Sequence, residues 1–263
     1  MKLTGVAAAA AACVLLSACA SHTGSDAGPQ TTLPTTGDES AQRARARIHT
    51  ELAANYFDIG NVGVALEEIK EALRADANYG PAHNVAGLVY AQLKEDRLAE
   101  ESFERALSIN PSDPDAHHNY GMFLCQRKQE REAIRHFMLA VRNPLYQAPE
   151  RSYINAGVCA RRSGDPAGAT EFFLLALKVR PNQPQALYQM ADLSYARGDY
   201  GETKRYLGRL TQVAQPTAEM LWLGVRVERR LGDRNSEASY ALQLRQRFPE
   251  SREAGALRAG RYE

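Results

Sequence analysis

Residues 87–107 read GLVYAQLKEDRLAEESFERAL, and their spacing decides the fold. Gly87 opens the stretch, Ala99 follows it by twelve residues and Phe103 follows it by sixteen. Apolar residues recur at helical spacing in each half, which is the pattern of two amphipathic helices. The missing side chain at Gly87 lets the two helices approach closely, and the ring of Phe103 fills the space beside it. The stretch therefore predicts a helical hairpin.

The same spacing recurs along the chain with a period near 34 residues. Small residues mark six units, at intervals of 34, 34, 36, 34 and 33 residues: Ala53, Gly87, Gly121, Gly157, Ala191 and Gly224. Twelve residues after each of these stands an alanine or a hydroxyl residue: Ala65, Ala99, Ala133, Ala169, Thr203 and Ser236. Sixteen residues after each stands a bulky one: Ile69, Phe103, Phe137, Phe173, Leu207 and Tyr240. The pattern resembles the tetratricopeptide repeat, in which helix pairs stack because one pair cannot bury its apolar face alone.

This resemblance implies an all-α tetratricopeptide-repeat α-solenoid of six helix pairs over residues 43–249. Residues 250–263 predict a C-terminal capping helix, because Ser251 is a suitable N-cap and Gly260 a suitable stop. Glycine followed by Asn or Asp suits the turns inside four of the pairs. These turns are Gly60-Asn61, Gly164-Asp165, Gly198-Asp199 and Gly232-Asp233.

Residues 1–18 have the pattern of a lipoprotein signal peptide. Lys2 gives a positive start, residues 6–16 are an apolar run too short to span a bilayer, and residues 16–19 (LSAC) resemble the bacterial lipobox. The resemblance implies that Cys19 is acylated, palmitate included, and becomes the first residue of a stably anchored lipoprotein. Ala20 stands where an Asp would favour the inner membrane, so we expect the periplasmic face of the outer membrane. The alternative is an ordinary signal peptide with a chance cysteine at its end.

Residues 19–42 are expected to comprise the acylated cysteine and a disordered tether. Thirteen of the twenty residues 21–40 are Ser, Thr, Gly or Pro. Such a segment cannot bury enough apolar surface to offset the entropy lost on ordering. The folded part is therefore expected to move close to the membrane on a flexible linker.

Two cysteines lie within the repeats. Cys125 and Cys159 fall on the first helices of units three and four, which are neighbours in the predicted stack. The periplasm is oxidising, so we predict a disulfide between them. The alternative is two separate buried thiols, and the separation of the two Cα atoms decides between them.

The composition excludes several classes of function. Lys and Arg number 32 and Asp and Glu 31, a balance that argues against a dedicated nucleic-acid binder. We find no nucleotide-binding loop, zinc-protease helix or nucleophile elbow, so no enzyme activity, cofactor or small-molecule substrate is expected. His117, His118 and His136 cluster in unit three. We favour partly exposed helix histidines over metal ligation for them.

A protein-binding groove is the remaining expectation. In tetratricopeptide arrays the first helix of each unit lines the concave face, and by that resemblance we predict ten contact residues. They are Phe57, Asn84, Leu88, Gln92, His118, Met122, Ile154, Val158, Tyr188 and Tyr195. This mostly apolar and amide set suits an amphipathic helix or an extended peptide. The alternative is that several of these residues only pack between units.

The 36-residue interval lengthens the segment Asn143–Glu150. Pro144 and Pro149 stop both flanking helices there. Leu145 and Tyr146 either pack on the neighbouring unit or contact a partner, and Tyr146 is counted among the candidate contacts.

The junction between units three and four carries a further resemblance. Residues 143–146 (NPLY), Pro149-Glu150 and residues 155–159 (NAGVC), with residues 119–121 (NYG) and Cys125, resemble the type IV pilus biogenesis and stability lipoprotein family. These proteins are pilotins of the pilus secretin. The resemblance implies the disulfide between Cys125 and Cys159. It also implies an outer-membrane lipoprotein that binds secretin subunits and helps them localise and multimerise during pilus biogenesis. The alternative is a scaffold lipoprotein that recruits cell-wall enzymes or outer-membrane assembly machinery.

Overall fold

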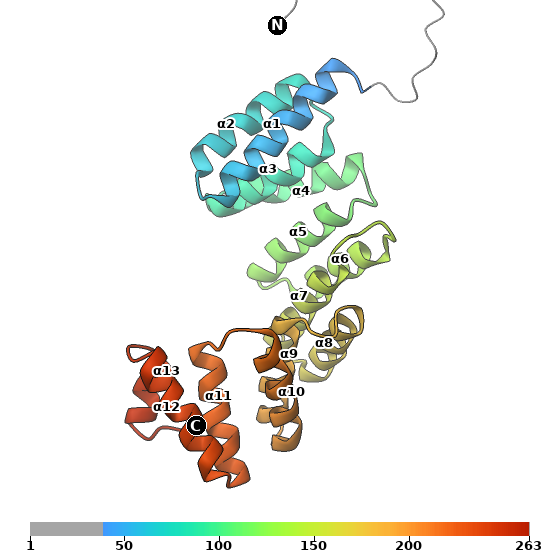
Figure 1. Ribbon diagram of the computed structural model, residues 1–263. Helices are drawn as coiled ribbons and strands as arrows, with labels where there is room; N and C mark the ends of the chain where they lie inside the picture. Colours follow the sequence, from blue (N-terminus) through green and yellow to red (C-terminus); the bar gives the residue numbers. More distant parts are fainter. Residues whose placement is uncertain (1–38, 263) are drawn as a thin grey trace, which may run out of the picture. The chain divides into compact units, whose positions relative to one another are not determined.

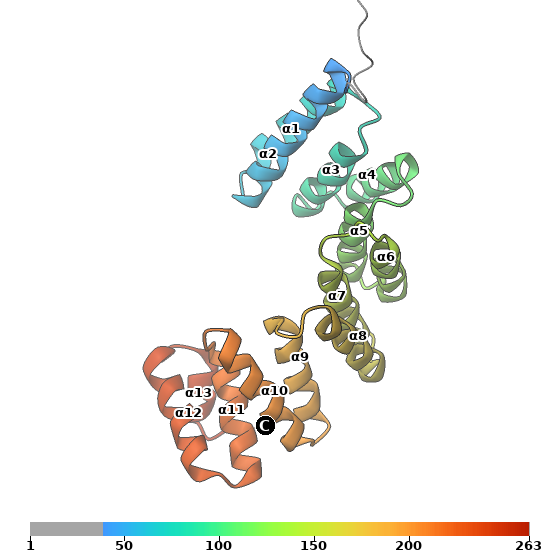
Figure 2. The same ribbon diagram turned by 45° about the vertical axis from the view of Figure 1, so that its right-hand side comes forward.

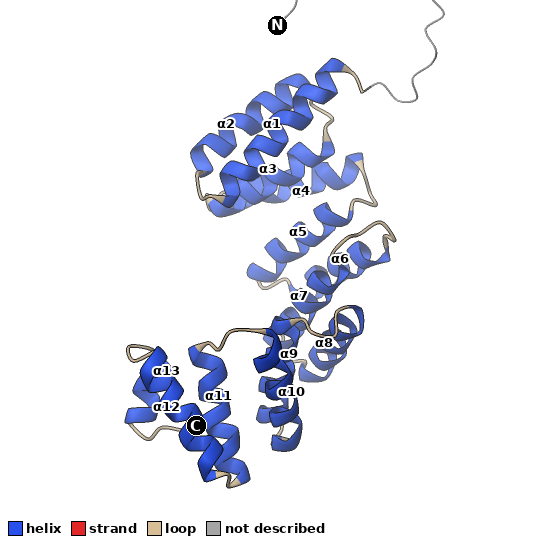
Figure 3. Cartoon of the chain, in the orientation of Figure 1, coloured by secondary structure: helices blue, strands red, loops and turns tan. Residues whose placement is uncertain are grey.

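Residues 39–262 are described by the computed structural model, and within them every regular element is an α-helix (Figure 3). The predicted signal peptide, the acylation site Cys19 and nearly all of the predicted tether lie outside these described residues. The helices run as follows: α1 (Ala41–Asp58), α2 (Val62–Ala75), α3 (Gly80–Gln92), α4 (Asp96–Ile109), α5 (Pro114–Gln126), α6 (Glu130–Arg142), α7 (Pro149–Arg162), α8 (Pro166–Val179), α9 (Pro184–Ala196), α10 (Tyr200–Val213), α11 (Ala218–Leu231), α12 (Arg234–Arg247) and α13 (Arg252–Arg258).

Consecutive helices pack as antiparallel pairs, from α1 with α2 to α11 with α12 (Figure 1). Each pair also contacts the next, and first helices of neighbouring units touch, as in α1 with α3 and α3 with α5. The short helix α13 packs against α11 and α12 (Figure 2). The fold is therefore the predicted all-α tetratricopeptide-repeat solenoid. Among the described residues, no helix is long and apolar enough to cross a membrane.

The small anchor residues explain why the paired helices fit. A Cβ atom built on Gly157 would lie 2.6 Å from Cε1 of Phe173, and one built on Gly87 would lie 2.6 Å from the same atom of Phe103. A Cβ atom built on Gly224 would lie 2.7 Å from Cδ1 of Tyr240. Units that carry alanine at the anchor carry an aliphatic partner instead, Ile69 or Leu207. Glycine thus accompanies the aromatic rings because they leave no room for a methyl group.

The turns inside the pairs follow the sequence in four units. Gly60, Gly164, Gly198 and Gly232 adopt φ values of 78° to 80°, which glycine reaches without steric cost. Units two and three place lysines in the same conformation, Lys94 at φ 65° and Lys128 at φ 63°. The turn geometry is therefore imposed by the packed helices on either side, even where the sequence lacks glycine.

The ends of the array depart from the predicted boundaries by a few residues. Helix α1 begins at Ala41, two residues before the predicted start at 43, because the Ser40 hydroxyl accepts a hydrogen bond from the Arg43 amide at 3.2 Å. At the other end the Ser251 hydroxyl accepts from the Ala254 amide at 3.1 Å, so Ser251 caps α13 as the sequence predicts. Between α6 and α7, Pro144 lies in the connection and Pro149 opens α7, as expected of residues that stop helices.

Candidate protein-binding surface

The predicted contact residues divide into buried and accessible groups. Seven are partly or fully exposed: Phe57, Leu88, Gln92, Met122, Val158, Tyr188 and Tyr195. Four are buried: Asn84, His118, Tyr146 and Ile154. Burial leaves these four side chains little surface for a partner, which agrees with the alternative that they pack between units. Three of the four, Asn84, His118 and Ile154, stand three residues before their small anchors, whereas Tyr188 at the same position before Ala191 stays partly exposed.

Asn84 and Ile154 pack against the neighbouring unit. The Asn84 side-chain oxygen accepts a hydrogen bond from the amide nitrogen of Asn119 on the next first helix at 3.1 Å. Ile154 belongs to the core formed with α8 and α9 and is 1% exposed. These side chains hold successive units together, which is the alternative that the sequence left open.

His118 is the centre of a buried polar cluster between α5, α7 and the α6–α7 connection. Its Nδ1 lies 2.8 Å from the hydroxyl of Ser152, which also donates to the hydroxyl of Tyr146 at 3.2 Å. Burial, helped by the charge of Arg151, lowers the pKa of His118 to about 4. The neutral imidazole and the Tyr146 ring therefore pack as structural parts of the junction.

Only one of the two loop side chains packs inward. Tyr146 is buried against His118, whereas Leu145 is 77% exposed at the tip of the connection. The amide of Leu145 donates to the side-chain oxygen of Asn143 at 2.9 Å, and the Asn143 side-chain nitrogen donates to the carbonyl of Ser112 at 2.7 Å. The loop is thus fastened to the preceding unit while it presents Leu145 to the surroundings.

The other two histidines of the predicted cluster, His117 and His136, form a second buried pair. The Nδ1 atoms of His117 and His136 lie 2.9 Å apart, so one ring must donate and the other accept. Burial is the main cause that lowers the pKa of both, to about 4 for His136. The described residues contain no group of three His, Cys, Asp or Glu that could hold a metal ion. The histidines are buried, contrary to the partial exposure that we expected from the sequence.

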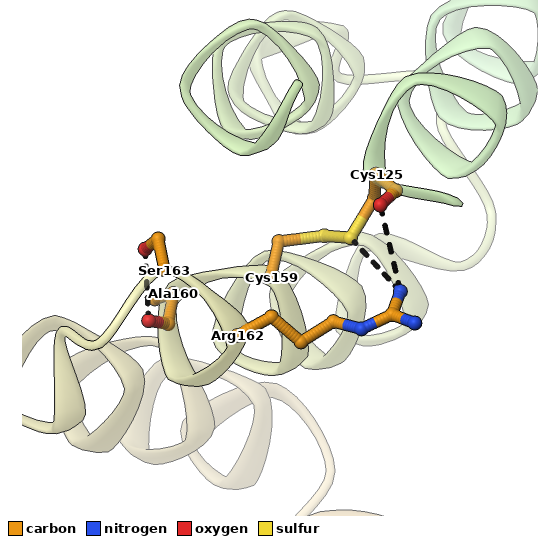
Figure 4. The surroundings of a disulfide bond; sticks show 5 residues. All are labelled: Cys125, Cys159, Ala160, Arg162 and Ser163. Carbon is orange, nitrogen blue, oxygen red and sulfur yellow. Dashed lines mark hydrogen bonds between the residues drawn. A yellow bond between two sulfur atoms is a disulfide. The ribbon is translucent and has the colours of Figure 1, made fainter. Parts of the chain in front are cut away.

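Cys125 and Cys159 lie side by side on α5 and α7 and are joined by a disulfide (Figure 4). Their Cα atoms are 5.9 Å apart, within the range that a disulfide spans. One guanidinium nitrogen of Arg162 lies 3.5 Å from the Cys125 carbonyl oxygen, and Arg162 covers the bond from one side. The disulfide thereby links the third unit to the fourth.

A surface hollow of about 130 Å³ opens over this disulfide. Met122, Gln126, Asn155 and Val158 line it together with Arg162. Met122 and Val158 each stand one residue after a small anchor and are half-buried, so each keeps apolar surface available to a partner. Of the predicted contact set, these two residues are brought together most directly by the structure.

The predicted contacts in unit five lie beside arginines that the sequence did not single out. The Arg226 guanidinium lies 4.2 Å from the ring centroid of Tyr195, and burial is the main cause that raises the pKa of Tyr188 to about 12. Arg229 and Arg230 follow Arg226 on the same helix, α11. Their spacing of three and four residues places all three on one helix face, a signal that sequence reasoning could have used.

The fold and this surface define a tetratricopeptide-repeat protein-binding scaffold. Two tetratricopeptide-repeat family models match residues 80–113 and 102–135. The type IV pilus assembly protein PilF of Pseudomonas aeruginosa is 31% identical over 226 residues, which cover 86% of this chain and 88% of that protein.

Two solved structures are similar over most of their length. The structure reported in a functional characterisation of Pseudomonas aeruginosa PilF has a TM-score of 0.76 and 29% identity, and the match covers 84% of this chain and 100% of that one. The crystal structure of PilW, described as a widely conserved type IV pilus biogenesis factor, has a TM-score of 0.72 and 30% identity, with 81% and 97% covered. The chain belongs to the tetratricopeptide-repeat family of type IV pilus biogenesis proteins that includes PilF and PilW.

Proposed function

We propose that this protein binds subunits of the pilus secretin and promotes their localisation and multimerisation in the outer membrane. The observation that carries the proposal is the relationship to PilF, which spans 88% of that type IV pilus assembly protein. The lipobox-like residues 16–19 support the second part of the proposal, an acyl anchor on Cys19. The repeats would hold the partner while the anchor keeps it at the membrane.

The accessible first-helix residues are the proposed contact surface. Leu88, Met122 and Val158 are half-buried apolar side chains on α3, α5 and α7, so each is fixed by packing and still offers surface. A few well-packed apolar anchors supply most of the affinity of such grooves, and the polar residues around them exclude water. Binding of this kind requires no bond making or breaking. The disulfide keeps Met122 and Val158 in register, because it joins the two helices that carry them.

Deletion of the protein tests the proposed function in cells. The expected result is loss of pili, with secretin that is monomeric or misplaced. The proposal would be contradicted if the deletion strain contained the normal amount of heat-resistant secretin multimers in the correct location. A Cys19→Ser variant is expected to fold and to leave the outer-membrane fraction. Cofractionation of this variant with the outer membrane would exclude the acyl anchor.

Site-specific photocrosslinking tests the proposed surface. A photoreactive residue at Leu88 or Met122 is expected to capture the secretin in living cells. The same residue at Leu174 is the matched control, because Leu174 is an exposed leucine on the second helix α8. Capture of a cell-wall enzyme in place of the secretin would favour the alternative scaffold function. Equal capture from Leu174 would exclude the first-helix surface.

A further inference from the structure

The C-terminal end of the array contains a recess that the proposed secretin groove does not use. A hollow of about 670 Å³ lies between α11, α13 and the residues up to Tyr262. A second hollow of about 410 Å³ shares Arg226, Gly260 and Tyr262 with it and extends to Tyr195 on α9. The two hollows share part of their lining, and we refer to them together as the arginine recess. Within the shared lining, the Arg226 Nε donates to the carbonyl of Tyr262 at 3.2 Å.

The lining of the arginine recess is strongly positive in a chain whose formal charge is only +1. It contains five arginines and a single carboxylate, that of Glu253, and the arginines are Arg226, Arg229, Arg230, Arg252 and Arg261. Arg229 is paired with Glu237 at 3.0 Å. No ion pair within residues 39–262 involves Arg226, Arg252 or Arg261. Arginine charges gathered in one lining repel one another and attract an anion into the recess.

Aromatic rings fix the arginine side chains from behind. The guanidinium carbon of Arg226 lies 4.2 Å from the ring centroid of Tyr195, and that of Arg229 lies 4.0 Å from the centroid of Tyr262. Tyr262 in turn stacks on Trp222, with 5.7 Å between the ring centroids. Stacking holds the planar guanidinium groups in place and leaves their edges available for hydrogen bonds. Little side-chain entropy therefore remains to be lost when a ligand binds.

We propose that the arginine recess binds an acidic segment of a polypeptide, with carboxylates on the arginines and an apolar side chain beside the parts of Tyr262 and Trp222 that line the recess. Guanidinium groups match carboxylates through paired hydrogen bonds, which are strong and directional. A concave recess admits an extended chain, whereas the surface of an anionic membrane is flat and attracts exposed basic faces. The recess lining holds no lysine, the residue that acts as a simple point charge. The proposal does not depend on the secretin as partner.

Trp222 provides a direct test, because it is the only tryptophan of the chain and lies in the recess. The probe is a short synthetic peptide of glutamates and glycines with one central phenylalanine. Its control has glutamine in place of every glutamate. We expect the acidic peptide to change the Trp222 emission in a saturable way and to show raised anisotropy when labelled. We expect the neutral peptide to do neither. Equal binding of both peptides would overturn the proposal.

Charge-removing variants locate the binding. Arg252→Gln with Arg261→Gln removes two exposed charges that make no ion pair in the described part of the chain, so the fold is preserved. Affinity for the acidic peptide should fall about tenfold, the equivalent of roughly 1.4 kcal/mol. Arg131→Gln with Arg142→Gln removes the same charge from α6 and should leave the affinity unchanged. An equal affinity for the wild type and the Arg252–Arg261 variant would overturn the proposal. A second result would also overturn it: the protein binds vesicles of an anionic phospholipid through these two arginines and does not bind the acidic peptide.

Discussion

Replacement of Gly157 by alanine should destabilise the protein, although alanine is the better helix former. The new Cβ would lie 2.6 Å, 2.8 Å and 2.8 Å from three ring carbons of Phe173, where carbon atoms in contact normally stay about 3.5–4.0 Å apart. Phe173 is fully buried, so its ring cannot swing aside. Overpacking of this severity costs about 3 kcal/mol, and alanine recovers about 1 kcal/mol of helix propensity. The free energy of unfolding should therefore fall by about 2 kcal/mol.

Urea unfolding followed by far-UV circular dichroism measures this change. Gly208→Ala is the matched control, because Gly208 is also helical and its added Cβ would meet no atom within 4 Å apart from the adjacent residues and the backbone of its own helix. It should raise the stability by up to about 1 kcal/mol. Phe173→Leu combined with Gly157→Ala recreates the alanine–leucine pair already present at Ala191 and Leu207. The double variant should be more stable than the sum of the single effects by about 1–3 kcal/mol. Gly157→Ala at or above wild-type stability, or the absence of this coupling, would refute the packing argument.

Three further measurements address the junction and the turns. In the folded protein His118 and His136 have pKa values of about 4, below the usual value of about 6.5, so the unfolded chain binds more protons between these limits. The free energy of unfolding should fall as the pH decreases from 6.5 to 4, by about 2 kcal/mol per imidazole at pH 5, and a flat profile in denaturant titrations would contradict this. Peptide mapping without reductant should recover Cys125 linked to Cys159, whereas two alkylated thiols in the unreduced protein would exclude the bond. Reduction should lower the free energy of unfolding by about 3–4 kcal/mol, because the two cysteines are 34 residues apart. Lys94→Gly should raise the melting temperature slightly, because glycine adopts φ 65° without the side-chain clash, and a lower melting temperature would count against a strained turn.

The repeat architecture could be predicted from the sequence because its determinants are local and periodic. Each helix pair is specified by a small residue and a bulky one sixteen positions later, as in Gly157 and Phe173. Both members lie within one unit, and the same spacing occurs six times along the chain. An error in one unit would therefore be visible against the others.

The accessibility of the predicted contact residues could not be predicted from the local sequence spacing. Whether His118 is exposed depends on Ser152 and Tyr146, which approach it only after units three and four have stacked. Met122, one position after its anchor, stays half-buried because it lines the hollow over the disulfide together with Asn155 and Val158 of the next first helix. A repeat pattern gives the helix, but the angle between neighbouring units decides which of its residues are covered.

The arginine recess was the hardest feature to foresee. Arg226 and Tyr262 are separated by 36 residues, and they meet only because the chain after α13 folds back onto α11. Neither the net charge of the chain nor the repeat spacing predicts the contact between Arg226 and Tyr262. The i, i+3, i+4 spacing of Arg226, Arg229 and Arg230 was the one local indication of it.

The most direct test of the central claim measures secretin multimers in cells that carry altered groove residues. Met122→Glu with Val158→Glu places two charges at the hollow over the disulfide, and Leu174→Glu with Leu175→Glu places the same charges on the exposed side of α8. Both variants must first be shown to fold and to accumulate at the wild-type level. If the protein acts by binding a secretin segment in the groove, heat-stable secretin multimers should be lost with the first variant and retained with the second. Normal multimers with the first variant would contradict the account.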